Sequence, residues 1–520
     1  MEEMCPSSVP PMGVTDDMAT VPTVEEVQAR ITQEVESAVA WVLSCQSITF
    51  FAFETQLVPK VLALGCLFVQ LFLCMRHERF QAVHPQPPTG FKQVGPCSRL
   101  LGTFFGKVRY WRMYFYRKGA GYYPLDVELG LTGDGFSMVL RSCATRMTTK
   151  VSYAQAALIL SLFLHWTPAQ ESIEGMVLGL GQHTAAWFES APAPEGDGEV
   201  LVIQIDSKAT PTATEAELEK RRGKRASNLH PGSQRHRGRA GRQRRGSKKR
   251  RKKGDKAKNG KMATIVTMYT LRRSVDSLLE GPINKKVYAS YAPKRHAVAI
   301  ARREADKRGF GPGSGKLVQI VTDGDNDLQR YIEELFPEAI HTVDVYHVTE
   351  YLWEAGQCLY QEGSAELVEW VEAQKETLYD GQAAKIVAEM DKQLAQLDPG
   401  KRSVRERLQR IRNYIDKRVD KMNYKQLREQ DLEISSGAVE GAVNYVIAKR
   451  FDSGGMRWIK ERAEHLLQLR CIEVNNDWDA FIQFVHDRTR EQAHRERKNL
   501  SLKCAEPSPL PTYGLDDLCG

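Results

Sequence analysis

Three acidic residues, far apart in the chain, have the type and the setting expected of metal ligands. Asp206 and Asp323 each end an apolar run that predicts a buried strand, EVLVIQID and LVQIVTD, and Glu440 lies in a helix that Ser435-Ser436-Gly437 opens. Ligands of open α/β sheets gather at the carboxyl ends of strands. Three carboxylates there would make a hard oxygen cage that suits Mg²⁺ or Mn²⁺. Two such ions can activate a water or a 3′-hydroxyl and stabilise the leaving oxygen of a phosphodiester.

The same residues also have a structural interpretation, which the sequence leaves open. An Asp that follows a strand commonly caps a helix or turns the chain, and Asp323-Gly324 fits such a turn. Residue types alone therefore indicate the two strands more strongly than they indicate a metal site.

The segments around the acids predict an α/β fold with a mixed sheet. A proline-rich linker at Ala191–Gly198 precedes the first strand, residues 199–206, and Leu317–Thr322 forms a later strand. Between and after them we expect strands at Met262–Leu271, Lys286–Tyr291 and Ile340–Val345 and helices at 294–308 and Leu328–Phe336. Three strands followed by alternating helices and strands are typical of mixed strand directions. From Val348 to about Leu432 the pattern is almost purely helical.

The residues before this sheet predict a mainly helical DNA-binding region. We expect a disordered N-terminus at 1–23, followed by a helical region at 24–80. The next region, 81–149, would contain a linker at 81–100 and a β-hairpin at 101–128. A helix-turn-helix-like region at 150–190 would follow. Residues 150–182 would form two or three helices, of which the second could enter a major groove. A plain helical core explains that pattern equally well.

Several features bear on the compartment. The apolar segment Val61–Met75 has fifteen residues, whereas a membrane span needs about 20, so we expect a buried helix and no membrane partner. The acidic, polar N-terminus lacks the pattern of a secretion signal. The ten cysteines form no C-x-x-C pair, which argues against a zinc ribbon and indicates reduced thiols in the cytoplasm.

The net charge of +8 is unevenly distributed. Lys220–Lys261 contains 20 basic residues and one acid, a local charge of +19, which leaves −11 on the rest of the chain. We expect a disordered basic loop at 218–261 that contacts DNA phosphates without reading sequence. A solvated loop without a partner is the alternative. The candidate DNA-binding residues within it are Arg244, Arg245, Lys248, Lys249, Arg250 and Arg251.

Two longer segments resemble a known family. VTDGDNDLQRYIEELFPEAIHTVDVYHVTEYLWEAG (321–356) and the segment that begins SSGAVEGAVNYVIAKRF (435–481) are similar to bacterial insertion-sequence DDE transposases of the ISKra type, related more distantly to Mutator-like enzymes. The resemblance runs from about residue 45 to 490. It implies a ribonuclease-H-like catalytic domain, split into 199–347 and 433–490 by an all-α insertion at 348–432. It also implies that Asp206, Asp323 and Glu440 bind two Mg²⁺ ions.

A D-x-x-H motif, Asp344 to His347, follows the second acid in this family. Asp344 ends a strand and is therefore the chief rival of Asp323 as metal ligand. For His347 we favour a core or helix-start residue that orients a neighbour. Asp325 and Asp327 are expected to be solvated or capping. The chain departs from the family where Ser207 replaces a common glycine and where the basic loop replaces a tight hairpin between the first two strands.

The stretch GGMRW after the third acid is a further candidate for DNA contact. Arg450, Arg457 and Trp458 could hold a strand by charge and stacking. Packing of Trp458 in the core is an equally good interpretation.

The resemblance implies a transposase that cleaves and joins insertion-sequence DNA ends. Its partners would be double-stranded DNA with terminal inverted repeats, target DNA and further copies of the chain, in the bacterial cytoplasm at the nucleoid. A metal-dependent nuclease on the same scaffold and a domesticated nucleic-acid-binding protein are the alternatives. Residues 491–520 are expected to be a disordered tail.

Overall fold

The computed structural model describes residues 21–83, 86–131, 133–164, 166–219, 260–276, 278–452 and 456–501. The described residues form two compact units: 21–187 with 477–501, and 188–476. Residues 477–490, predicted as part of the catalytic domain, therefore belong to the first unit. Residues 1–20, 220–259 and 502–520, which contain most of the segments predicted to be disordered, lie outside the described residues.

The first unit begins with a hairpin of two long helices, α1 (Val24–Ser44) and α2 (Phe50–Val83), and Thr23 starts α1 with a capping box. The sequence predicted that Val61–Met75 lies in a buried helix, and for α2 this prediction is wrong. Its buried residues are Leu73, Cys74, His77 and Phe80, whereas Phe68 is 55% exposed, because α1 and the sheet cover only part of its surface. In the described part of the chain, α2 is the helix long and apolar enough to cross a membrane, and one such helix is weak grounds for a span.

A three-stranded antiparallel sheet follows, made of β1 (Lys92–Gly102), β2 (Lys107–Arg117) and β3 (Ala120–Tyr122). The predicted hairpin is confirmed, but it begins inside the predicted linker. The predicted helices at 150–182 are α5 and α6, and Ser152 starts α5 with a capping box. The helices of this unit after the sheet are α3 (Pro124–Leu129), α4 (Met138–Thr148), α5 (Tyr153–Phe163), α6 (Gln170–Gly181), α7 (Thr184–Ser190, which ends in the second unit) and α20 (Trp478–Ser501).

The second unit is built on a mixed five-stranded sheet in the order β6-β5-β4-β7-β8. Neighbours β4, β5 and β6 are antiparallel, whereas β4, β7 and β8 are parallel. The predicted mixed α/β architecture is confirmed. The strands are β4 (Val200–Pro211), β5 (Gly260–Arg273), β6 (Leu279–Ser290), β7 (Leu317–Thr322) and β8 (Ile340–Val343).

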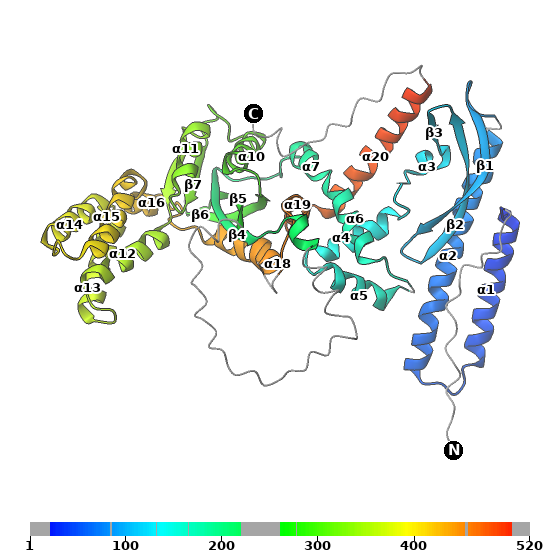
Figure 1. Cartoon of the computed structure of the whole chain (residues 1–520), viewed down its shortest axis with the longest axis horizontal. Coiled ribbons are helices and arrows are strands. Elements are labelled where there is room, and N and C mark those ends of the chain that lie inside the picture. Colours follow the sequence, from blue (N-terminus) through cyan, green and yellow to red (C-terminus); the bar gives the residue numbers. More distant parts are fainter. Residues whose placement is uncertain are drawn as a thin grey trace. The chain divides into compact units, whose positions relative to one another are not determined.

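Alternate residues of the central strands face two different cores. Leu201, Ile203 and Ile205 of β4 pack against α10 (Lys294–Lys307) and α11 (Asn326–Leu335). Val200 and Val202 belong to a second core, shared with a helical bundle that Figure 1 shows gathered beside β7. The bundle is made of α12 (Val345–Leu359), α13 (Ala365–Tyr379), α14 (Ala383–Gln396), α15 (Arg402–Asp416), the 3₁₀ turn η1 (Val419–Lys421) and α16 (Tyr424–Glu429).

The chain then returns to the sheet. The returning elements are α17 (Gly437–Ala442), the π-helical segment η2 (Val443–Ala448), α18 (Lys449–Phe451) and α19 (Lys460–Val474). α17 and η2 contact β4, and α19 contacts β6.

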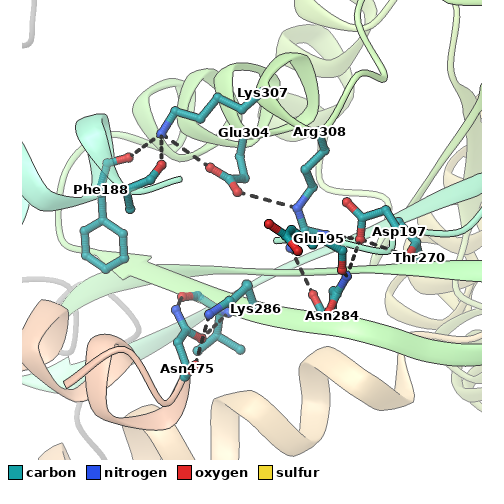
Figure 2. A network of polar contacts seen from close by, with 12 residues as sticks. Phe188, Glu195, Asp197, Thr270, Asn284, Lys286, Glu304, Lys307, Arg308 and Asn475 are labelled. Atoms are coloured by element: carbon teal, nitrogen blue, oxygen red, sulfur yellow. Dashed lines mark hydrogen bonds and ion pairs between the residues drawn. The ribbon is translucent and has the colours of Figure 1, made fainter. Parts of the chain in front are cut away.

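Hydrogen bonds from α10 and β6 hold the linker that precedes β4 in place (Figure 2). Lys307 donates to the carbonyl oxygens of Phe188 and Ala191 at 3.0 and 3.3 Å. The Asn284 side-chain amide donates to the Glu195 carbonyl and the Asp197 carboxylate at 2.8 and 2.9 Å. These bonds fix the entry of the chain into β4.

Candidate active site

Asp206 and Asp323 lie at equivalent places on neighbouring parallel strands. The last in-register pair of β4 and β7 is Ile205 with Thr322, so the next residue along each strand is one of the two acids. Adjacent strands are about 4.8 Å apart, which makes the two backbones neighbours at this point. Because side chains alternate along a strand, Asp206 faces the same side of the sheet as Gln204.

Asp344 extends this row by one strand. β7 and β8 pair up to Thr322 with Val343, and Asp344 follows. Its side chain is 2% exposed and is the N-cap of α12, with Oδ1 accepting the Tyr346 amide at 2.9 Å and Oδ2 accepting the Ser436 hydroxyl. Asp323 is partly exposed, and its Oδ1 accepts the Asp325 amide at 3.0 Å. Asp325 caps α11, as expected.

Two buried glutamines hold the segment that leads to the third acid against the sheet. Gln204 of β4 donates to the Ser435 carbonyl at 3.1 Å and accepts the Val439 amide at 2.9 Å. Gln319 of β7 donates to the Glu433 carbonyl at 2.6 Å and accepts the Glu433 amide at 3.0 Å. Residues 433–439 are therefore bonded to β4, which carries Asp206, and to β7, which Asp323 follows. The predicted end of the first strand at Asp206 is wrong, because pairing with β5 continues β4 to Pro211.

Glu440 follows directly and is exposed in the first turn of α17. Its Oε1 is 3.5 Å from the hydroxyl oxygen of Ser436, whose single hydrogen is donated to the closer Asp344 carboxylate. The helix continues into η2, a π-helical segment of a kind that is frequent at functional sites.

The charges of the other two predicted ligands act on the Asp206 carboxyl. Burial raises the pKa of the Asp206 carboxyl, the charges of Asp323 and Glu440 raise it further, and the Ser207 amide and the charge of His347 lower it. His347 is partly exposed on α12, with its ring stacked edge-on against Tyr351. The site thus concentrates negative charge that a bound cation would relieve.

The turn after Asp323 is held from the helical bundle. The Tyr414 hydroxyl donates to the Asp323 carbonyl at 2.7 Å, and the Arg418 guanidinium donates to the Gly324 carbonyl at 2.8 Å. Gly324 has φ +77°, which disfavours other residues. Sequence reasoning missed Tyr414 and Arg418, whose place beside the turn no local pattern reveals. It also missed the glutamines, although a Gln inside each apolar strand was a visible signal.

The donor set fits a hard cation, because carboxylate oxygens are the preferred ligands of Mg²⁺ and Mn²⁺. Among the described residues, no group of three His, Cys, Asp or Glu side chains is assembled closely enough to hold a metal as it stands. A metal site here is therefore inferred from donor type, strand position and unbalanced charge.

The candidate DNA-binding residues separate into two groups. Arg244, Arg245 and Lys248 to Arg251 lie outside the described residues. For Trp458 the structure favours the core interpretation, since it is 9% exposed and its ring packs at a tilt against Phe451, with the ring centroids 5.0 Å apart. Arg450 is 2% exposed with its guanidinium over the Trp458 ring, so burial withdraws both from stacking with a base. Arg457 remains partly exposed.

Searches of models of known protein families and of curated proteins find no match for this chain. What the site does is therefore inferred from its own geometry.

Proposed function

We propose that this protein is a DDE transposase, which cleaves the DNA at the ends of an insertion sequence and joins the freed 3′ ends to target DNA. The observation that carries the proposal is the placement of Asp206 and Asp323 directly after the last in-register pair of β4 and β7, with the segment that leads to Glu440 bonded to the same two strands. An ordinary capping Asp would not require a second carboxylate beside it and a third bonded into the same place.

The sheet supports a ribonuclease-H-like assignment of the second unit. Three antiparallel strands are followed by two parallel ones, and the acids fall on the central strand and its parallel neighbour. In the sequence, the bundle α12–α16 lies between Asp344 and Glu433, where the resembled family carries its all-α insertion.

Asp206, Asp323 and Glu440 would hold two Mg²⁺ or Mn²⁺ ions. Bound ions would supply the Lewis acidity that activates a water or a 3′-hydroxyl and stabilises the leaving oxygen. The chain's own contribution is positioning. Gln204 and Gln319 fix the segment before Glu440, and the bond from Ser436 to Asp344 fastens the start of α17 to the end of β8. His347 contributes positive charge when protonated, which favours the ionised form of Asp206.

The partners follow from the same proposal. The protein would bind double-stranded DNA with terminal inverted repeats and target DNA, and it would act as a homo-oligomer in the bacterial cytoplasm at the nucleoid. The local charge of +19 at Lys220–Lys261 supports contact with DNA phosphates. The helix pair α5–α6 is the candidate for reading the element end.

The test is a joining assay with an element-end duplex, a target plasmid and Mg²⁺. We expect joined products from the natural chain and no cleavage by Glu440→Gln, which should still bind the duplex. Glu429→Gln is the matched control, because Glu429 is exposed on α16 and its replacement removes the same charge at a position outside the site. Cleavage by Glu440→Gln would refute the assignment of that residue, and cleavage without joining would reassign the protein as a nuclease.

A further inference from the structure

A polar groove of about 670 Å³ runs along α15 toward the start of α11. Its lining includes Arg405, Arg410, Lys417 and Arg418, with Glu406 as the acidic member. A groove this size is large enough for a ligand rather than a single water. Neither the predicted metal site nor the predicted DNA-binding residues include it.

The positive charge in the groove is not cancelled by its own contacts. Arg405 donates to the carbonyl oxygens of Leu394 and Leu397 at 2.8 and 2.9 Å. Arg418 donates to the carbonyls of Gly324 and Tyr414 and to the Asn326 side chain. These acceptors are neutral, so neither guanidinium charge is cancelled by a carboxylate; because Arg418 is only 3% exposed, its charge acts on an anion through the electrostatic potential of the groove and not by open contact.

The other charged side chains leave the balance positive. Glu406 pairs with Arg402, outside the groove, at 2.9 Å. Arg410 shares the Glu354 carboxylate with Arg407, two guanidinium groups to one acid. Lys417 is exposed at the end of α15. A polyanion fits this balance better than an apolar or a cationic ligand does.

The groove begins at the second acid of the candidate site. Tyr414 and Arg418 line it, and they also bind the carbonyls of Asp323 and Gly324. Asn326 lines it as well and accepts from Arg418 at 2.6 Å. A strand whose phosphate reaches Asp323 would therefore have its neighbouring phosphates beside this groove.

We propose that the α15 groove binds backbone phosphates of the DNA strand next to the bond that is cut. This rests on the proposed function, because it assumes that DNA reaches Asp323. Binding here would give register and affinity but no sequence preference, since phosphates are the same in every sequence.

The test measures DNA binding rather than cleavage. Lys417→Gln and Arg410→Gln are compared with Lys392→Gln, all without the basic loop so that its charge does not mask the effect. Lys392 is 70% exposed on α14 and lies two residues, about 200° around the helix, from the groove residue Leu394. In Arg410→Gln, Glu354 keeps Arg407 as its partner at 2.7 Å, so no carboxylate is isolated.

Affinity for a labelled duplex is read by fluorescence anisotropy across a salt series, without added metal. Each groove variant should weaken binding about tenfold, as for one lost charge-assisted bond, and lower the slope of log affinity against log salt by about 1. Lys392→Gln should change neither. Equal affinities and slopes for Lys417→Gln, Arg410→Gln and Lys392→Gln would refute phosphate binding in the α15 groove, even if the joining assay succeeds. Altered slopes together with no cleavage by the natural chain would support phosphate binding in the groove and refute the proposed transposase activity.

Discussion

Replacing Gln204 by Met should release the segment that carries Glu440 while leaving the sheet in place. Methionine keeps the length and most of the volume of glutamine, so the loss is confined to hydrogen bonds. Gln204 is 1% exposed, and without it the Ser435 carbonyl loses the donor that Gln204 supplies, whereas the Val439 amide loses one acceptor and keeps the Ser436 carbonyl at 3.0 Å. An unsatisfied buried group costs about 1–3 kcal/mol and a lost hydrogen bond about 1 kcal/mol, so the change amounts to about 2–4 kcal/mol.

Hydrogen exchange at the Val439 amide measures this loss directly. The lower value, about 2 kcal/mol, corresponds to exchange about thirtyfold faster. Gln319→Met is the matched control, because it removes the partner of the Glu433 amide and leaves that of Val439. Each variant should therefore accelerate a different amide. Unchanged exchange of Val439 in Gln204→Met, or the same pattern in both variants, would refute the reasoning.

Four further results are expected. Gly324→Ala should lower the free energy of unfolding by about 1–3 kcal/mol in urea titrations, because φ is +77° and the added Cβ would lie 2.6 Å from the Tyr414 hydroxyl oxygen. Burial lowers the pKa of His341 to about 4, so between pH 6.5 and 4 this imidazole binds a proton in the unfolded chain and stays neutral in the folded chain. Stability should fall by about 2 kcal/mol from pH 7.5 to 5, and His341→Gln should remove that fall. Replacing 220–259 by a short linker should weaken DNA binding and flatten its salt dependence, with the sheet intact because Pro211 and Gly260 are paired. In cleavage assays Asp323→Asn should be inactive, whereas Asp344→Asn should keep part of the activity because Asn also caps a helix.

The sequence predicts the elements whose patterns are local. β7 begins and ends where the run LVQIVT does, and α10 matches the predicted helix to within one residue, because burial of whole strands and of one helix face imposes a visible period. The exposure of α2 was not predictable in this way. Its composition is that of a buried helix, but burial depends on which other elements cover it, and that is a property of the fold.

The site divides along the same line. Apolar strands that end in Asp predict that Asp206 and Asp323 lie at one edge of the sheet. The register that sets them side by side arises only when β4 pairs with β7, across more than a hundred residues of intervening chain. Gln204 and its partner Val439 are separated by 235 positions, so neither residue alone indicates the other.

Asp323 and Asp344 look alike in sequence, since each follows a strand, and they differ in what their carboxylates do. For Asp344 to become a ligand it would have to give up the Tyr346 amide, which starts α12, and the Ser436 hydroxyl. Losing such a cap costs about 1 kcal/mol and would also break the bond that holds Ser436 at the start of α17. The Asp323 turn is instead held through its carbonyl oxygens by Tyr414 and Arg418, so its position does not depend on its carboxylate alone. Other residues thus fix the backbone of Asp323, whereas the Asp344 carboxylate caps α12 and binds Ser436, which is why we propose Asp323 as the metal ligand and Asp344 as a residue that positions the start of α17.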